Sequence, residues 1–233
     1  MKSRDAGRGQ ARPAPATVAG MTDHAESKGP PAASAATLPA ERLKAFADAV
    51  VAIAMTLLIL PLMESVGDAA ADHLSSFEWL NQNAGQLFSF VLSFVLIANF
   101  WLTHHRLFAG IHRVTNGLLW LTIAWMFTIV WLPIPTALLG QLETDAGQEI
   151  LYIGTLALTS LVMFLSRLYV LRHPSLHDIP ESRLRSGLAA DLVTLGLFLL
   201  ALAVALVFPD VGYWAMFLLL LVAPVHRLIR RRR

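Results

Sequence analysis

Cysteine is absent from this chain of 233 residues, and charged residues make up only 15% of it. Without cysteine the chain forms no disulfides and no thiolate metal sites. So little charge excludes an ordinary soluble domain, in which about 25% of residues are charged. Glycine-rich phosphate loops, Ser-His-Asp sets, paired carboxylates and His-Glu metal motifs are also missing, so we predict neither an enzyme nor a bound cofactor.

Hydrophobic residues, by contrast, make up 56% of the chain, and its mean hydropathy is +0.59. They form six blocks, each long enough to cross a hydrocarbon core of about 30 Å. Backbone groups in lipid must bond within their own segment, so each block should be a helix. We predict an all-α, polytopic membrane protein with six transmembrane helices per subunit. The predicted spans are 41–63, 87–108, 114–139, 149–171, 188–208 and 211–229.

The positive charges predict how these spans are oriented. All 18 Lys and Arg residues lie at or before the start of the first block, between the second and third, around the connection of the fourth and fifth, or after the sixth. The other connections carry acids and no cation. Because Lys and Arg mark the cytoplasmic side, we predict a multi-pass protein with both termini in the cytoplasm.

The two ends of the chain differ from the apolar middle. Residues 1–40 are rich in Ala, Pro, Gly and Ser, which predicts a disordered cytoplasmic tail before a six-helix membrane domain at 41–230. Residues 231–233 form a basic C-terminal end. We interpret this end as an anchor for anionic membrane lipids rather than a nucleic-acid patch, because it directly follows a span.

The first block, "FADAVVAIAMTLLIL", has one acid and one narrow apolar face. At 100° per residue, Ile53, Leu57 and Leu60 fall within about 40° of one line, with Thr56 about 60° away. Arg42 and Phe46 extend the same line toward the start of the block. Asp48 lies about 140° from this line, so we expect its carboxylate to face neighbouring helices.

Polar partners for Asp48 lie at the same predicted depth, since the first span starts and the second ends at the cytoplasm. They are Trp101, His104 and His105 near the end of the second block, and Asn116 at the start of the third. A role as a helix cap is an alternative for the acid. A metal shared by the two histidines is not expected, because successive helical side chains point about 100° apart.

Two prolines, Pro133 and Pro135, lie near the outer end of the third block. They remove two backbone donors, which predicts a kink or an early end of that helix.

Taken together, these motifs resemble the transmembrane protein 175 family, the potassium channels of endolysosomes and their prokaryotic relatives. The resemblance starts with Arg42, three residues, then "FADAV" and "AIAMTLLIL". It continues through "FWLTHHRLF" (100–108), Asn116 and "LPIPTALL" (132–139), and covers essentially all of 41–230. One departure is Ala47, where the family has a serine.

The resemblance to the single-repeat prokaryotic members implies a protein of a bacterial cell membrane. It also implies a homotetramer, because the chain holds one copy of the family's repeat, with the first helix of each subunit lining a central pore. It implies that apolar side chains form the constriction, and the matching positions are Ile53, Leu57 and Leu60, with Thr56 beside them. It also implies a bracing polar network. That network would consist of Arg42, Phe46, Asp48, Trp101, His104, His105 and Asn116.

The function implied is a potassium-permeable cation channel with a hydrophobic gate, open to other monovalent cations as well. The alternative is a proton-coupled secondary transporter that uses Asp48, His104 and His105 as a relay. Against a transporter, the spans contain no corresponding pair of Gly/Pro-broken helices and no internal repeat.

Overall fold

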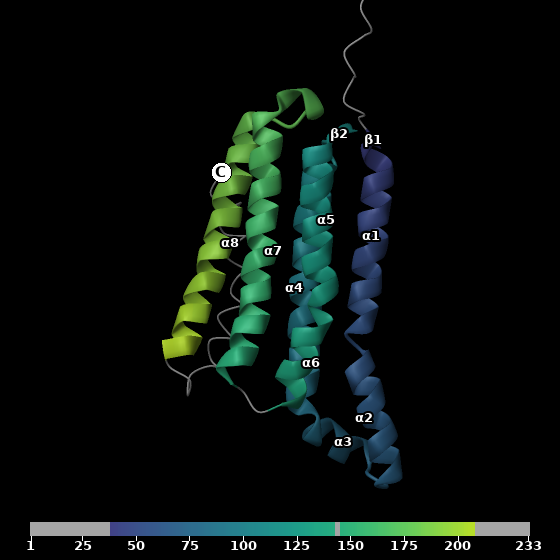
Figure 1. The fold of residues 1–233 in the computed structure, drawn as a ribbon. Helices are drawn as coiled ribbons and strands as arrows, with labels where there is room; N and C mark the ends of the chain where they lie inside the picture. The colour runs from purple at the N-terminus through teal and green to yellow at the C-terminus, as the bar shows by residue number, and fades with distance from the viewer. Residues whose placement is uncertain (1–37, 143–144, 208–233) are drawn as a thin grey trace, which may run out of the picture. The chain divides into compact units, whose positions relative to one another are not determined.

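The protein is described by a computed structural model that covers residues 38–142 and 145–207, and these residues are almost entirely helical (Figure 1). They form eight α-helices, one short 3-10 helix and two strands of two residues each. The helices are α1 (Ala40–Leu57), α2 (Leu60–Ala71), α3 (Ser76–Gln82), α4 (Ala84–Phe108), α5 (Asn116–Trp131), α6 (Pro133–Gln141), α7 (Ala146–Arg172) and α8 (Glu181–Val207). The remaining elements are β1 (Leu38–Pro39), β2 (Arg113–Val114) and η1 (Pro174–Leu176).

Five helical stretches in the described residues are long and apolar enough to cross a membrane. They are Ala40–Ala71, Ala84–Phe108, Asn116–Gln141, Ala146–Arg172 and Glu181–Val207. The all-α, multi-pass membrane class is thus confirmed, and these stretches match the first five predicted spans. The sixth predicted span, 211–229, the basic end at 231–233 and the tail up to residue 37 lie outside the described residues.

The bounds differ from the prediction where helices continue beyond the apolar blocks. The last residues of the predicted tail are ordered, since β1 begins at Leu38 and α1 at Ala40. At the other side, α8 begins at Glu181 instead of residue 188. Its first polar turn is stabilised as a helix by the ion pair between Glu181 and Arg185, one turn apart, which a search for apolar residues cannot detect.

Proline interrupts the first membrane stretch between α1 and α2. Pro61 has no N–H to donate to the carbonyl of Leu57, and α1 ends at that residue. Leu58 and Ile59 keep right-handed helical dihedrals, so the chain resumes as α2 at Leu60. The prediction of one uninterrupted helix over 41–63 was wrong on this point, because it counted Pro61 as an ordinary apolar residue.

The third membrane stretch is interrupted as predicted. Helix α5 ends at Trp131, and α6 begins at Pro133 with its prolines in the first turn, where no backbone donor is needed. The amide of Leu132 donates to Ile129, three residues back, at 3.2 Å. The kink or early end expected from Pro133 and Pro135 is therefore confirmed.

The helices enclose one apolar core. Helix α7 packs along α8 and α5, α4 packs on α6, and α1 packs on α5 and α4. Large side chains such as Trp125, Phe108 and Phe198 are fully buried between them. Figure 1 shows α1 beside α5, with α7 and α8 on the far side of α5.

Loops far apart in the sequence meet at the end of the bundle where α1 begins. Strand β1 pairs antiparallel with β2, so the start of α1 lies against the connection between α4 and α5. The same connection meets the one between α7 and α8, where the amide of Asp178 donates to the carbonyl of Gly110 at 3.1 Å. The start of α1 and the two connections predicted to be cytoplasmic therefore lie together.

The short helix α3 lies at the other end and was not predicted. A capping box starts it: the Ser75 hydroxyl accepts from the Glu78 amide, and the Ser75 amide donates to the Glu78 carboxylate at 2.8 Å. The Ser-x-x-Glu spacing was the sequence signal that could have revealed it.

Candidate functional site

Helix α1 has a buried face and an opposite face that no described element of the subunit covers. Its buried residues follow helical spacing and are Ala40, Leu43, Ala47, Val51 and Ala54. The opposite face, here called the open face, consists of Phe46, Ala49, Ile53, Thr56, Leu57 and Leu60. Every one of its side chains is exposed, and Ile53 is exposed to 59%.

The open face contains all four residues of the predicted constriction. Ile53, Thr56 and Leu57 lie on α1, and Leu60 is the first residue of α2. The break before Pro61 does not turn Leu60 away from the others, since it is also exposed.

Thr56 supplies the one polar side chain in the middle of the open face. Its hydroxyl donates to the carbonyl of Ile53 at 2.7 Å. With its proton engaged by the backbone, the hydroxyl oxygen keeps lone pairs for an acceptor contact on the exposed side.

Asp48 lies on a different side of α1 and contacts α4. The indole Nε1–H of Trp101 donates to Asp48 Oδ1 at 2.7 Å, which joins α1 and α4 near the end where β1 and β2 pair. Nδ1 of His105 lies 3.9 Å from the same carboxylate oxygen, and its ring is 5.4 Å from the Trp101 ring. The structure thus brings together three residues of the predicted polar network.

His104 is not part of this contact. Its ring is buried and stacked at 4.2 Å on each of Phe108 and Trp125, and its Nε2 has no hydrogen-bond partner. The expectation that His104 faces Asp48 was wrong because position 104 lies on the core side of α4, where two aromatic rings enclose the imidazole.

Three further residues of the predicted network form no polar contact with Asp48 in the described part of the chain. Asn116 is exposed at the first position of α5, and its side chain bonds to no described residue. Arg42 is exposed and forms no ion pair with a described acid. Phe46 belongs to the open face rather than to a polar contact. Residue spacing predicts which side chains share one face of a helix, but not how that helix is rotated toward its neighbours. The sequence therefore could not predict which of these side chains reach Asp48.

A buried ion pair between α7 and α8 was missed. Nε of Arg167 donates to Asp191 Oδ2 at 2.6 Å, and both side chains are almost fully buried. Gly187 makes room for the pair, since a Cβ there would lie 2.6 Å from the Arg167 guanidinium carbon. The signal was present in the sequence: a cation inside one predicted span and an acid inside the next.

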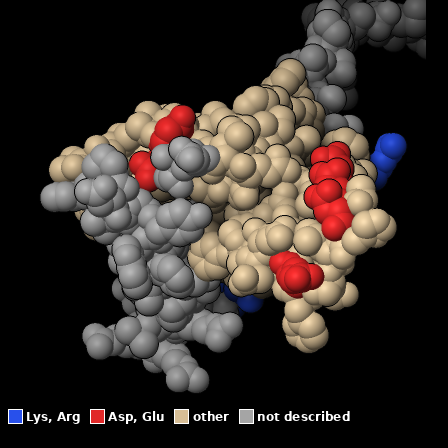
Figure 2. Space-filling view, turned by 90° about the horizontal axis from the view of Figure 1, so that it is seen from below, with Lys and Arg blue, Asp and Glu red and all other residues tan. Residues whose placement is uncertain are grey.

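The two ends of the described bundle carry opposite charge. Figure 2 views the end formed by α2, α3 and α6, where acids gather and cations appear only at the margin. The acids of this end are Glu64, Asp68, Asp72, Glu78, Asp145 and Glu149. At the opposite end lie the described Lys and Arg residues near the helix ends, together with an ion pair of 2.6 Å between His112 and Asp178.

Metal chemistry has no support in the described residues, where no three His, Asp or Glu side chains lie close enough to hold an ion. The open face, the Asp48 contact and the apolar stretches instead define a multi-pass helical membrane protein with an unpartnered apolar helix face.

The helices of this chain match the crystal structure of a lysosomal potassium-selective channel TMEM175 homolog from Chamaesiphon minutus with a TM-score of 0.64. The match covers 79% of this chain and 96% of that chain at 22% identity, which shows a common fold.

Sequence comparison finds similarity to channel proteins over part of the chain. A family model described as "Endosomal/lysosomal potassium channel TMEM175" matches residues 42–133 of the chain. A protein named a potassium channel from Streptomyces collinus (strain DSM 40733 / Tue 365) is 33% identical over 125 residues, 52% of this chain. An endosomal/lysosomal proton channel TMEM175 from Danio rerio is 28% identical over 60% of this chain. The chain spans 56% of the first of these relatives and 26% of the second. The family and these relatives are described as channels and not as enzymes, in agreement with the prediction.

Proposed function

We propose that the protein is a potassium-permeable cation channel in which four copies surround an axis and the open face of α1 lines the pore. Ile53, Leu57 and Leu60 form the constriction, and Thr56 lies beside them. The observation that carries this proposal is the open face itself: large apolar side chains at helical spacing are exposed opposite a face buried in the subunit. The names of the relatives from S. collinus and D. rerio support ion permeation.

An apolar constriction conducts by a different principle from a filter of carbonyl oxygens. Rings of Ile and Leu offer no ligands, so a cation that passes must keep part of its water or lose several kcal/mol of hydration. Such a ring closes when water leaves it and opens on a small dilation. Selectivity follows from the lower dehydration cost of potassium compared with sodium, and the Thr56 oxygen reduces that cost further.

The contact between Asp48 and Trp101 braces this helix rather than carrying ions. It lies on the side of α1 that faces α4, away from the open face, and the indole already occupies one carboxylate oxygen. The contact fixes the rotation of α1 about its own axis, and therefore the direction in which the open face points.

The charge difference between the two ends supports a cytoplasmic location for the end where β1 and β2 pair. The acidic end then faces outward, where clustered negative charge raises the local concentration of cations at the pore mouth. Both termini are cytoplasmic in this arrangement, and the basic C-terminal end contacts anionic lipids of the bacterial cell membrane.

The alternative, a proton-coupled transporter, has less support. A relay through Asp48 and both histidines requires the three side chains to be within reach of one another, whereas the His104 ring lies between Phe108 and Trp125. Proton permeation through the same pore remains compatible with the D. rerio relative, and the flux assay below includes it.

The function is tested by reconstituting the full chain into liposomes and comparing potassium, sodium, caesium and proton flux. Passive potassium flux without a proton gradient is expected. Ile53→Asn and Leu60→Asn introduce an ion ligand at the constriction, and we expect increased sodium flux relative to potassium. Val91→Asn is the matched control, since Val91 on α4 is exposed to a similar degree, 55% against 59% for Ile53. Unchanged selectivity in both the Ile53→Asn and the Leu60→Asn variant would refute the constriction.

Assembly is tested separately by disulfide cross-linking. Because the chain contains no cysteine, every disulfide would come from the introduced residue. Ile53→Cys should form disulfide-linked dimers under mild oxidation, because side chains at a common axis come within bonding range. Val91→Cys should not. Native mass spectrometry of the unmodified protein should give four subunits. A monomer in lipid, or cross-linking only at Val91→Cys, would show that the open face points to lipid.

A further inference from the structure

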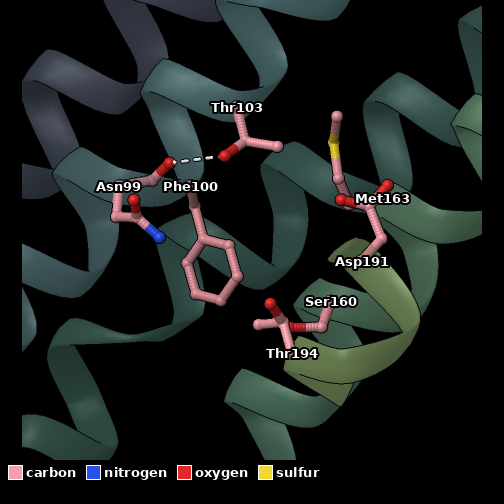
Figure 3. Close-up of a pocket in the computed structure, with 7 residues that line it drawn as sticks. All are labelled: Asn99, Phe100, Thr103, Ser160, Met163, Asp191 and Thr194. Atoms are coloured by element: carbon pink, nitrogen blue, oxygen red, sulfur yellow. Dashed lines mark hydrogen bonds between the residues drawn. The ribbon is translucent and has the colours of Figure 1, made fainter. Parts of the chain in front are cut away.

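A small, partly open cavity lies between α4, α7 and α8. Its volume is about 10 Å³, the room that one water molecule needs. Figure 3 shows Asn99 and Thr103 of α4 on one side, residues of α7 and α8 on the other, and the Phe100 ring between them in this view. The residues lining the cavity are Asn99, Phe100, Thr103, Ser160, Met163, Asp191 and Thr194.

Most of these side chains are polar, although the cavity lies within predicted membrane spans. The Ser160 hydroxyl is buried, with the residue 2% exposed, and has no hydrogen-bond partner. The side-chain amide of Asn99 also bonds to no described residue, and the Thr103 hydroxyl bonds to the Asn99 carbonyl at 2.9 Å. Because an unsatisfied buried hydroxyl costs about 1–3 kcal/mol, a polar occupant that bonds to Ser160 would be stabilising.

We propose that this cavity is a binding site for a single ordered water molecule that bonds to Ser160 and hydrates the buried carboxylate of Asp191. The water would link α7 and α8, through Ser160 and Asp191, to Asn99 on α4. Helix α4 is also the helix that carries Trp101, the partner of Asp48 on α1. The proposal does not depend on the proposed channel function.

The charge of the site favours water over an ion of similar size. The cavity has room for one occupant of water size, and polar walls supply the two to four partners that a buried water makes. A monovalent cation would need a net negative site. Here the guanidinium of Arg167 already neutralises Asp191 at 2.6 Å, so a second cation would meet like charge.

The test uses X-ray radiolysis, which converts bound water into hydroxyl radicals that oxidise neighbouring thioethers. Met163 lines the cavity and is 2% exposed, whereas Met126 is similarly buried, at 5%, and does not line it. The full chain in lipid nanodiscs is exposed to short X-ray pulses, and methionine sulfoxide is quantified by mass spectrometry. We expect Met163 to be oxidised several-fold faster than Met126, and Ser160→Ala to remove most of this difference.

The outcomes are distinct. Equal, slow oxidation of both methionines would show that the cavity is dry and would overturn the proposal. Faster Met163 oxidation that is unchanged in Ser160→Ala would overturn the assigned bond. Oxidation that falls as potassium or sodium is added, and rises in their absence, would show that an ion occupies the cavity instead of water. Thermal unfolding of Ser160→Ala, expected within a few degrees of the parent, checks that the variant is folded.

Discussion

The ion pair between Arg167 and Asp191 gives the sharpest prediction about stability. Its two side chains are 11% and 4% exposed and their nearest atoms lie 2.6 Å apart, so replacing Arg167 takes a close ionic partner away from a buried carboxylate. Breaking such a pair costs about 3–5 kcal/mol. For a chain of this size each kcal/mol corresponds to roughly 2–4 °C, so Arg167→Met should lower the melting temperature by about 6–20 °C.

Helix α8, which carries Asp191, also contains an exposed ion pair that serves as a matched control. Glu181 and Arg185 also approach to 2.6 Å, but their side chains are 64% and 71% exposed. Water and salt screen this pair, so Arg185→Met should cost less than about 1 kcal/mol. Both variants are measured by thermal unfolding of the purified protein in one detergent, at one protein concentration.

A double variant separates the charge from the packing. Arg167→Met combined with Asp191→Leu removes both charges and keeps apolar volume, and replacing a whole buried pair is often neutral or stabilising. The double variant should therefore be more stable than Arg167→Met alone. The reasoning is refuted if the double variant is destabilised by the sum of the losses in Arg167→Met and Asp191→Leu. It is also refuted if Arg185→Met lowers the melting temperature as much as Arg167→Met, because burial would then not determine the cost.

Three further predictions concern local contacts. Gly187→Ala should destabilise by about 1–3 kcal/mol because its Cβ would overlap a guanidinium, whereas Gly196→Ala, with open space around it, should be neutral or stabilising in the same thermal assay. Trp101→Phe should cost about 1–2 kcal/mol in thermal unfolding through loss of its bond to a carboxylate of α1. Hydrogen bonds from the side chain and backbone of Ser75 hold the pKa of Glu78 below its usual 4.5, so the cap persists above that pH and is lost as the pH falls through the lowered pKa. The NMR resonance of the Ser75 amide should shift with a midpoint below pH 4.5, and a midpoint at or above it would contradict the capping box.

Much of the fold was predictable because lipid restricts the backbone to few choices. Apolar blocks of sufficient length must be helices, and the distribution of Lys and Arg groups the connections by side. What periodicity missed are local features: the interruption at Pro61, the polar first turn of α8 and the capped helix α3. Each depends on specific hydrogen bonds, which average hydropathy does not contain.

The candidate site was predictable in part. The angular positions of the side chains around α1 could be calculated from the sequence. The predicted constriction residues do share one face with Phe46, and Asp48 lies on another. The partners on other helices required the rotation of those helices. Trp101 and His104 are separated by one turn of α4, yet the first contacts Asp48 and the second is enclosed by aromatic rings.

Hydropathy alone cannot decide whether the open face of α1 meets lipid or other copies of the helix, because a lipid tail is as apolar as leucine. Packing can decide, since helices associate in membranes where small side chains allow close approach. Ala45, Ala49 and Ala52 are all exposed on α1, next to the larger residues of the open face. A helix that packs against a neighbouring copy can use such small side chains for close contact while Ile53 and Leu57 point toward the axis. The small residues therefore favour the arrangement in which the open face is shared between subunits.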